Sequence, residues 1–208
     1  MSFTAKEKLT QISKRTDNKS IKEKNLYEAA YELFTTKGIY DTSIDDIVKK
    51  AGVAKGTFYL YFMNKYDIID RIILKKASSI IEKAVKATEE KALSDYTDIV
   101  IYVIDYIIEY LRENKKLLKL IHKNLSWGLY RKALANPEEY KIMEYIRKYF
   151  IKVINENNMK AEELENNLFM IIELTGSVCY SSIILQEPAN IDEMKPALFK
   201  MIKKMLAN

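Results

Sequence analysis

Apolar side chains recur along the chain at the three- and four-residue spacing of amphipathic helices. The first helix is expected over residues 21–37, with Leu26 and Phe34 on its apolar face. Ser20 is placed to cap its start, and Gly38 supplies the residue at which helices commonly stop. The chain therefore opens its periodic part with one amphipathic helix, and residues 1–19 are expected to form a flexible basic arm.

Two short helices joined by a tight turn are predicted next. Ser43 followed three residues later by Asp46 fits a capping box, and Gly52 ends the helix that this box begins. A second short helix is expected from Lys55 to about Phe62. This arrangement is typical of a helix-turn-helix, in which the second helix presents its N-terminal residues to the major groove of DNA.

Helical periodicity continues to the C-terminus, and an all-α fold is expected. The chain holds only 5 Gly and 3 Pro, with no Pro before Pro137, which favours long helices over turn-rich strands. The further helices are predicted over residues 65–86, 94–112, 117–125, 137–155, 161–185 and from 190 onward. We divide the chain into the arm (1–19), a three-helix helix-turn-helix domain (20–66) and a larger helical domain (67–208).

Positive charge is concentrated in the N-terminal third of the chain. Residues 1–66 carry 12 Lys and Arg against 8 Asp and Glu, whereas the whole chain has a net charge of only +5. Such an excess attracts a polyanion, although a solvated surface would have the same composition. The basic arm itself fits either an adjacent groove of DNA or a segment with no function.

The residues of the helix-turn-helix carry a family resemblance. The stretch TSIDDIV (42–48), followed by AGVAKGTFYLYF (51–62) and NK (64–65), resembles the signature of TetR-like transcription regulators. The helix before it fits as well, and the likeness covers about residues 24–70 without a gap. One residue departs from the pattern, because Ala54 stands where a capping Ser or Thr is common. The loss of that cap costs about 1 kcal/mol of helix stability.

The resemblance implies a repressor that binds a palindromic DNA operator. Gly56 lets the second helix approach DNA closely, and Lys55 and Thr57 flank it at the exposed helix start. Phe58 and Phe62 are expected in the core, whereas Tyr59 or Tyr61 alone fits a packed aromatic residue equally well. The implied DNA-contacting residues are Thr42, Ser43, Lys55, Gly56, Thr57, Tyr59, Tyr61 and Lys65.

The same resemblance implies a homodimer and a small-molecule effector, and places both in the second domain. The dimer interface is expected at Thr175, Gly176, Leu198, Met201, Ile202 and Met205. The same residues, at helical spacing along the last two long helices, also fit an intramolecular core. An apolar or mildly polar effector is expected among the aromatic residues Tyr102, Tyr106, Tyr110, Trp127, Tyr130, Phe169 and Tyr180. An aromatic stripe at helical spacing equally fits plain core packing.

Enzymes and membrane proteins fit the sequence poorly. His122 is the only histidine, and no phosphate loop or nucleophile elbow is present, so neither catalysis nor a metal or other cofactor is expected. Cys179, the only cysteine, lies in an apolar stretch, which favours a buried thiol and a reducing, cytoplasmic compartment. No unbroken apolar run reaches the length of a membrane span. A helical ligand-binding protein without a DNA role remains the rival to a regulator.

Overall fold

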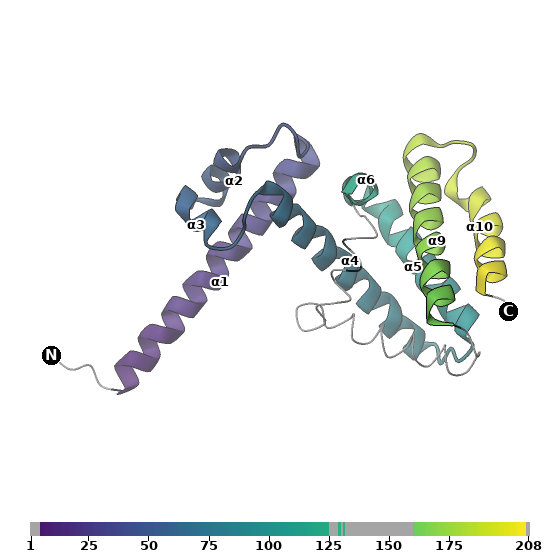
Figure 1. The fold of residues 1–208 in the computed structure, drawn as a ribbon, viewed down its shortest axis with the longest axis horizontal. Coiled ribbons are helices and arrows are strands. Elements are labelled where there is room, and N and C mark those ends of the chain that lie inside the picture. The colour runs from purple at the N-terminus through teal and green to yellow at the C-terminus, as the bar shows by residue number, and fades with distance from the viewer. Residues whose placement is uncertain (1–4, 125–128, 130, 132–159, 207–208) are drawn as a thin grey trace. The chain divides into compact units, whose positions relative to one another are not determined.

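In a computed structural model, every element of the described part of the chain is helical, as the sequence predicts. The structure describes residues 5–124, 129, 131 and 160–206, with side chains from residue 19 onward except residue 123. The chain divides into two compact units, Met1–Ile72 and Ile73–Asn208. Figure 1 shows their elements from α1 at the N-terminus to α10 near the C-terminus.

Three helices and the start of a fourth build the first unit. They are α1 (Ala5–Thr36), α2 (Ile44–Ala51), α3 (Lys55–Tyr59) and the first turns of α4 (Lys65–Glu90). Helix α2 packs against both α1 and α3. The largest fully buried side chains of this unit come from all four helices, so they share one core: Leu26, Ile47, Phe58, Phe62 and Ile68.

Helix α1 differs from the prediction at its N-terminus. It begins at Ala5, so Ser20 lies inside the helix and does not cap it, and residues 5–19 are helical in place of the expected flexible arm. The physical reason is composition, because residues 5–20 contain no Gly or Pro and include several strong helix formers, such as Ala5 and Leu9. Nothing in that stretch stops a helix from continuing toward the N-terminus.

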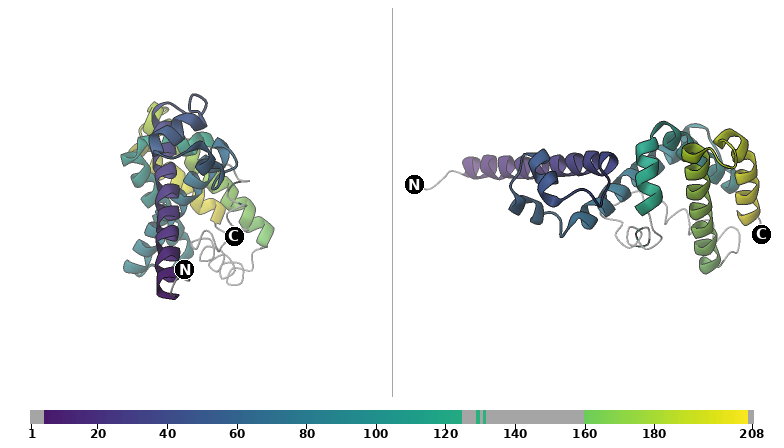
Figure 2. Two further views of the ribbon diagram at one scale, coloured as in Figure 1. Left: turned by 90° about the vertical axis from the view of Figure 1, so that its left-hand side faces the viewer. Right: turned by 90° about the horizontal axis from the view of Figure 1, so that it is seen from above.

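The second unit contains the rest of α4 and the helices that follow. They are α5 (Tyr96–Glu113), α6 (Lys115–Asn124), α9 (Ala161–Cys179), a π-helical turn η1 (Tyr180–Leu185) and α10 (Ile191–Leu206). Helices α9 and α10 pack side by side, and both contact α5 (Figures 1 and 2). The helix predicted over residues 137–155 lies outside the described residues.

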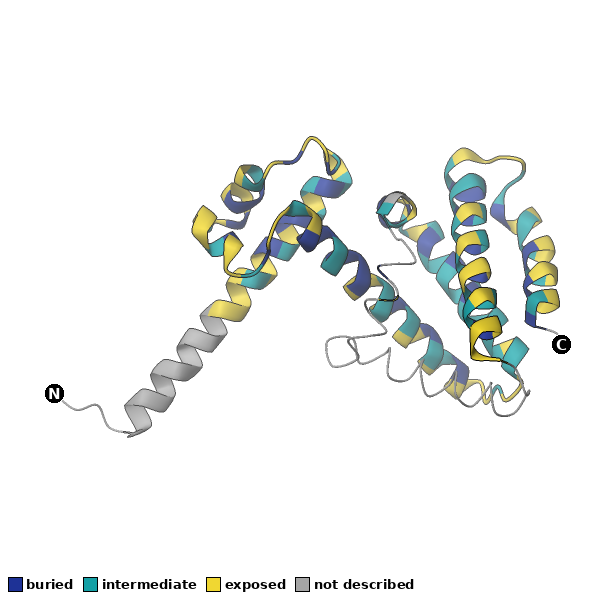
Figure 3. Cartoon of the chain, viewed as in Figure 1, coloured by how far each residue is buried: buried dark blue, intermediate teal, exposed yellow. Residues whose placement is uncertain are grey.

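One continuous helical stretch of the second unit is both long and apolar. Ala161–Leu185 has a mean hydropathy of 1.8, so one helix reaches the length and composition of a membrane span, contrary to the sequence expectation. Only 28% of its apolar window is buried in the chain's own fold. Core helices of water-soluble helical proteins have the same composition. Figure 3 shows exposed residues along α9, and the apolar side chains of Phe169 and Met170 are among them.

Candidate nucleic-acid interface

Local capping fixes the two helices of the helix-turn-helix. The Ser43 hydroxyl accepts the backbone N–H of Asp46 at 3.0 Å, and the Asp46 carboxylate accepts the backbone N–H of Ser43 at 3.0 Å. These two bonds make the predicted capping box. At the other end of α2, Gly52 adopts φ +66°, a left-handed conformation that favours glycine and turns the chain toward α3. The sequence predictions for both ends of α2 are confirmed.

Helix α3 is short and begins without a side-chain cap. It runs only from Lys55 to Tyr59, and a turn at residues 60–61 replaces the predicted continuation to about Phe62. Ala54 supplies no capping hydrogen bond, as expected from its side chain. Phe58 and Phe62 are both buried and their rings lie 5.4 Å apart between centroids, which confirms them as core residues. They anchor the inner face of α3, so its other face is presented outward.

The outward residues at the start of α3 form a surface that we call the reading face: Lys55, Gly56, Thr57 and Tyr59. Lys55, Gly56 and Tyr59 are exposed, and Thr57 is half-buried. A Cβ atom added to Gly56 would meet nothing within 4 Å, so no side chain of this chain covers that position. A duplex can therefore approach the α3 backbone closely at Gly56.

Lys55 is held in an ion pair across the turn. Its ammonium lies 2.9 Å from Oδ1 and 3.0 Å from Oδ2 of Asp45, in the first turn of α2. The hydrogen bond and the charge of Asp45 raise the pKa of Lys55 above its usual value, so the side chain stays protonated at neutral pH. Sequence analysis did not single out Asp45, although a separation of ten residues across a helix-turn-helix brings the two side chains together.

The other predicted DNA-contacting residues have partners inside the unit. Thr42 is buried, and its hydroxyl donates to the carbonyl of Gly38 at 2.7 Å. Tyr61 is half-buried, and its hydroxyl donates to the Lys19 carbonyl at 2.9 Å. Burial, followed by the nearby charge of Glu23, raises the pKa of Tyr61. The structure thus ties Thr42 and Tyr61 to α1 and to the loop that follows it.

Lys65 makes the most extensive of these internal contacts. Its ammonium donates to the carbonyls of Ile39 at 2.9 Å, Tyr40 at 3.2 Å and Thr42 at 3.2 Å. These bonds attach the start of α4 to the loop between α1 and α2. Asn64 caps α4 by accepting the N–H groups of Tyr66 and Asp67, as the sequence predicts. In this arrangement Lys65 stabilises the frame that carries the reading face.

The residues predicted to surround an effector lie in several places in the second unit. Tyr102, Tyr106 and Tyr110 are half-buried on α5, whereas Phe169 is exposed on α9. Tyr180 is half-buried and stacks on His122 with ring centroids 4.0 Å apart. Trp127 and Tyr130 lie outside the described residues. The five described residues are thus spread over α5, α9 and η1.

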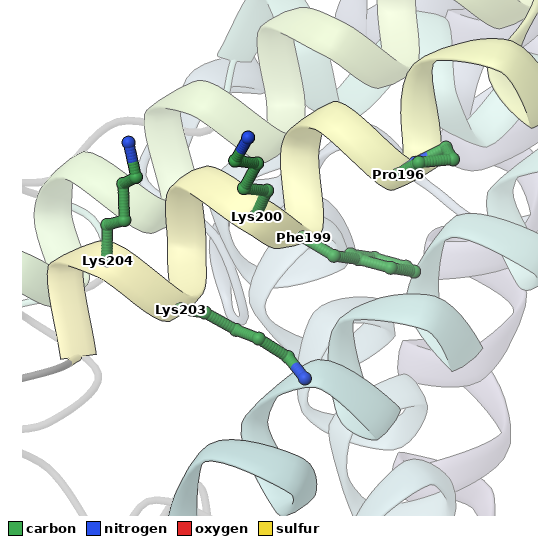
Figure 4. A pocket seen from close by; sticks show the side chains of 5 residues that line it. All are labelled: Pro196, Phe199, Lys200, Lys203 and Lys204. Atoms are coloured by element: carbon green, nitrogen blue, oxygen red, sulfur yellow. The ribbon is translucent and has the colours of Figure 1, made fainter.

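An open hollow occurs on α10, away from those tyrosines. It has a volume of about 540 Å³ and is lined by Pro196, Phe199, Lys200, Lys203 and Lys204. Figure 4 shows Phe199 and Lys203 extending from one side of α10, and Lys200 and Lys204 from the other. Lys203 is directed toward Asp98 of α5, with 3.9 Å between the charged groups. Neither composition nor spacing pointed to this surface as an effector site.

The expected dimer residues divide into buried and exposed groups. Thr175, Leu198 and Ile202 are buried within the chain's own unit, and Gly176 and Met205 are half-buried. Met201 is 46% exposed on α10. Two apolar side chains of the neighbouring helix α9, Phe169 and Met170, are also 40% and 43% exposed. Sequence analysis assigned Phe169 to the effector site and did not assign Met170 to the interface.

Known proteins resemble this chain over both units. Residues 26–72 match the family model for bacterial regulatory proteins of the tetR family. The fatty acid metabolism regulator protein of Bacillus subtilis is 39% identical over 67 residues, which are 32% of this chain and about a third, 34%, of that protein. The uncharacterized HTH-type transcriptional regulator YvdT of the same organism is 26% identical over 89% of this chain and 95% of its own length.

Solved structures extend the likeness to the whole fold. The regulator FadR from Bacillus subtilis, in complex with stearoyl-CoA, matches 86% of this chain and 97% of its own with a TM-score of 0.61 and 19% identity. At that identity the match shows a shared fold. The matched family segment contains the capped α2, the Gly52 turn and the reading face. Over residues 26–72 the chain is therefore similar to the bacterial regulatory proteins of the tetR family, and its overall fold is shared with the regulator FadR.

Proposed function

We propose that this protein is a homodimeric repressor that binds a palindromic DNA operator in the cytoplasm and releases it when a small molecule binds the second unit. The observation that carries the proposal is the reading face. Lys55, Gly56 and Tyr59 lie exposed at the start of α3, on a helix whose other face is fixed by Phe58. Their donors and the open backbone at Gly56 are what base edges and phosphates require.

Removal of reading-face side chains tests the DNA-binding part of this proposal. An operator is first selected from a genomic library with the purified protein. The Lys55→Gln and Tyr59→Ala variants are then expected to bind that operator about tenfold more weakly in a mobility-shift titration at fixed salt, because each loses a base or phosphate contact.

Lys116→Gln is the matched control, since Lys116 is an exposed lysine of α6 in the second unit. It is expected to bind like the wild type. Failure of the wild-type protein to retain any duplex at low ionic strength would exclude the proposed function.

Dimer formation is supported by the uncovered apolar surface of α9 and α10. These helices pack against each other, and Phe169, Met170 and Met201 keep 40–46% of their surface exposed. A second copy of the chain related by twofold symmetry would place the same surface opposite itself and cover both. Two recognition helices would then contact two half-sites of a palindrome, at a spacing of about 34–36 Å or a multiple of it.

Charge placed in this surface tests the dimer. Met170→Asp combined with Met201→Asp is expected to convert the protein from dimer to monomer in sedimentation equilibrium, because two facing carboxylates would be buried without partners. Tyr40→Asp serves as the control, since Tyr40 is 87% exposed in the first unit. A double variant that stays dimeric would place the interface elsewhere.

The effector is proposed to be an apolar or mildly polar small molecule. The half-buried tyrosines of α5 supply an aromatic surface with hydroxyl groups, and FadR with its bound stearoyl-CoA shares the fold. Acyl-CoA thioesters of different chain length are therefore the first probes. An effector must lower DNA affinity by the factor by which DNA lowers effector affinity.

Fluorescence anisotropy of the labelled operator measures this release, with free coenzyme A as the control for the acyl chain. Deletion of the gene is expected to raise transcription from the selected operator's promoter, and lowered transcription would exclude a repressor.

A further inference from the structure

Asp45 lies on the surface of the first unit, next to the reading face. It belongs to the first turn of α2, and the turn through Gly52 brings its carboxylate to Lys55, the first residue of α3. Both carboxylate oxygens lie within 3.0 Å of the Lys55 ammonium. The side chains of Asp45 and Lys55 are 70% and 53% exposed, so this pair lies at the surface that a duplex would meet.

The neighbouring carboxylate, that of Asp46, caps the start of α2. Asp46 accepts hydrogen bonds from the backbone N–H and the hydroxyl of Ser43, at 3.0 and 2.9 Å. The side-chain partner that the structure gives Asp45 is Lys55 alone, among the residues described. The two acidic residues of one helical turn are thus divided between capping α2 and neutralising a cation of the reading face.

Such a neutralising carboxylate weakens attraction to any duplex. Phosphates carry no sequence information, and a lysine on its flexible stem can reach them on DNA of every sequence. A carboxylate beside that lysine offers it an internal partner and also repels phosphates. A lysine ammonium carries three N–H donors, so Lys55 can donate to Asp45 and still offer a donor to a base edge while the pair is intact.

We propose that Asp45 is a specificity-determining residue, which holds Lys55 on the reading face and keeps it from acting as a general phosphate anchor. In a complex with a random duplex, Lys55 must leave Asp45 before it contacts a phosphate. In the complex with the operator, Lys55 contacts a base while Asp45 orients it. Asp45 therefore lowers the affinity for random DNA more than the affinity for the operator. This inference rests on the proposed DNA-binding function.

The test measures binding to a random-sequence duplex as a function of salt. Each phosphate neutralised adds about −0.9 to the slope of log K against log salt. Asp45→Asn is expected to make that slope steeper by about 0.9 for each recognition helix, and to tighten random-duplex binding about two- to fivefold per helix at low salt. The ratio of operator affinity to random-duplex affinity is expected to fall.

A second substitution shows whether the effect passes through Lys55. The gain from Asp45→Asn is expected to shrink by at least half when it is measured in the Lys55→Gln background. The control is Glu32→Gln, which removes the carboxylate of a comparable exposed pair, with Lys50, whose charged atoms are 2.7 Å apart. It is expected to change random-duplex affinity by less than twofold.

Three results would overturn the role of Asp45. They are an unchanged slope and affinity in Asp45→Asn, an equal gain with and without Lys55, or an equal gain in Glu32→Gln. Circular dichroism and a second variant, Asp45→Ala, separate these results from loss of the fold. A wild-type protein that binds no duplex at all would instead contradict the proposed function itself.

Discussion

The two units of the chain differ in how completely their buried polar side chains find hydrogen-bond partners. In the first unit, Ser43 and Asp46 cap one another, and Lys65 donates to three carbonyls of the preceding loop. In the second unit, the buried hydroxyls of Thr175 and Ser182 make no hydrogen bond in the described structure. Exposed apolar side chains occur in both units, Leu60 and Met63 in the first and Met170 and Met201 in the second. Among the described residues, buried side-chain polar atoms without a hydrogen bond therefore occur in the second unit and not in the first.

The largest expected effect on stability comes from replacing a buried phenylalanine, compared with the same substitution at an exposed one. Phe58 is fully buried in the first unit, and Phe58→Ala is expected to lower the free energy of unfolding by about 3–5 kcal/mol and to abolish DNA binding near 37 °C. Phe169 is 40% exposed in the second unit, so Phe169→Ala is expected to cost less than about 1 kcal/mol in the monomer. Urea unfolding followed by circular dichroism measures both values.

Protein concentration sharpens this comparison. If a second copy covers Phe169, the midpoint of unfolding in Phe169→Ala falls with dilution more steeply than in the wild type. The Phe58→Ala variant is expected to lose stability equally at all concentrations above dimer dissociation. Equal and concentration-independent losses for the two variants would contradict an interface between two copies of the chain at Phe169.

An intermediate effect is expected from Lys55, the first residue of α3, and Lys65, the first residue of α4. Lys65→Met removes three hydrogen bonds to backbone carbonyls and is expected to lower the free energy of unfolding by about 1–2 kcal/mol. Lys55→Met removes only an exposed ion pair, so its unfolding midpoint in urea is expected to match the wild type while its DNA affinity falls. Lys65→Arg controls for the retained charge. A Lys65→Met variant with wild-type stability and weakened DNA binding would contradict the role of Lys65 in stabilising the first unit.

Features that depend on neighbouring residues could be read from the sequence. The capping box of Ser43, the left-handed turn at Gly52 and the cap at Asn64 each involve atoms within a few residues of one another. The absence of a cap at Ala54 follows from the same local chemistry. Periodicity also placed Phe58 in the core, because one face of a short helix next to a turn has to be buried.

Features that depend on tertiary contacts could not be predicted in the same way. The carbonyls that accept hydrogen bonds from Lys65 lie 23 to 26 residues away in sequence, so no local sequence pattern predicts these contacts. The pair of Asp45 with Lys55 requires the exact turn between two helices. An aromatic stripe such as Tyr102 and Tyr106 has the same spacing whether it lines a cavity or fills a core. The effector site therefore stays a prediction.

The smallest expected effect concerns pH at the start of α2. Hydrogen bonds from the backbone and side chain of Ser43, together with the charge of Lys37, lower the pKa of Asp46 below its ordinary value of 3.8. The carboxylate therefore stabilises the folded state at all pH values above 3.8, and this contribution is lost as the pH falls through the lower pKa of the folded state. Asp46→Asn removes the charge at every pH. The wild-type protein is thus expected to melt at a higher Tm than the variant from pH 7 to about 4, with the difference shrinking below that range.

The control is Asp41→Asn, which changes an exposed aspartate of the preceding loop and is expected to show no such pH-dependent difference. A difference in Tm between wild type and Asp46→Asn that grows on acidification would show that the carboxylate is not held in its charged form by Ser43.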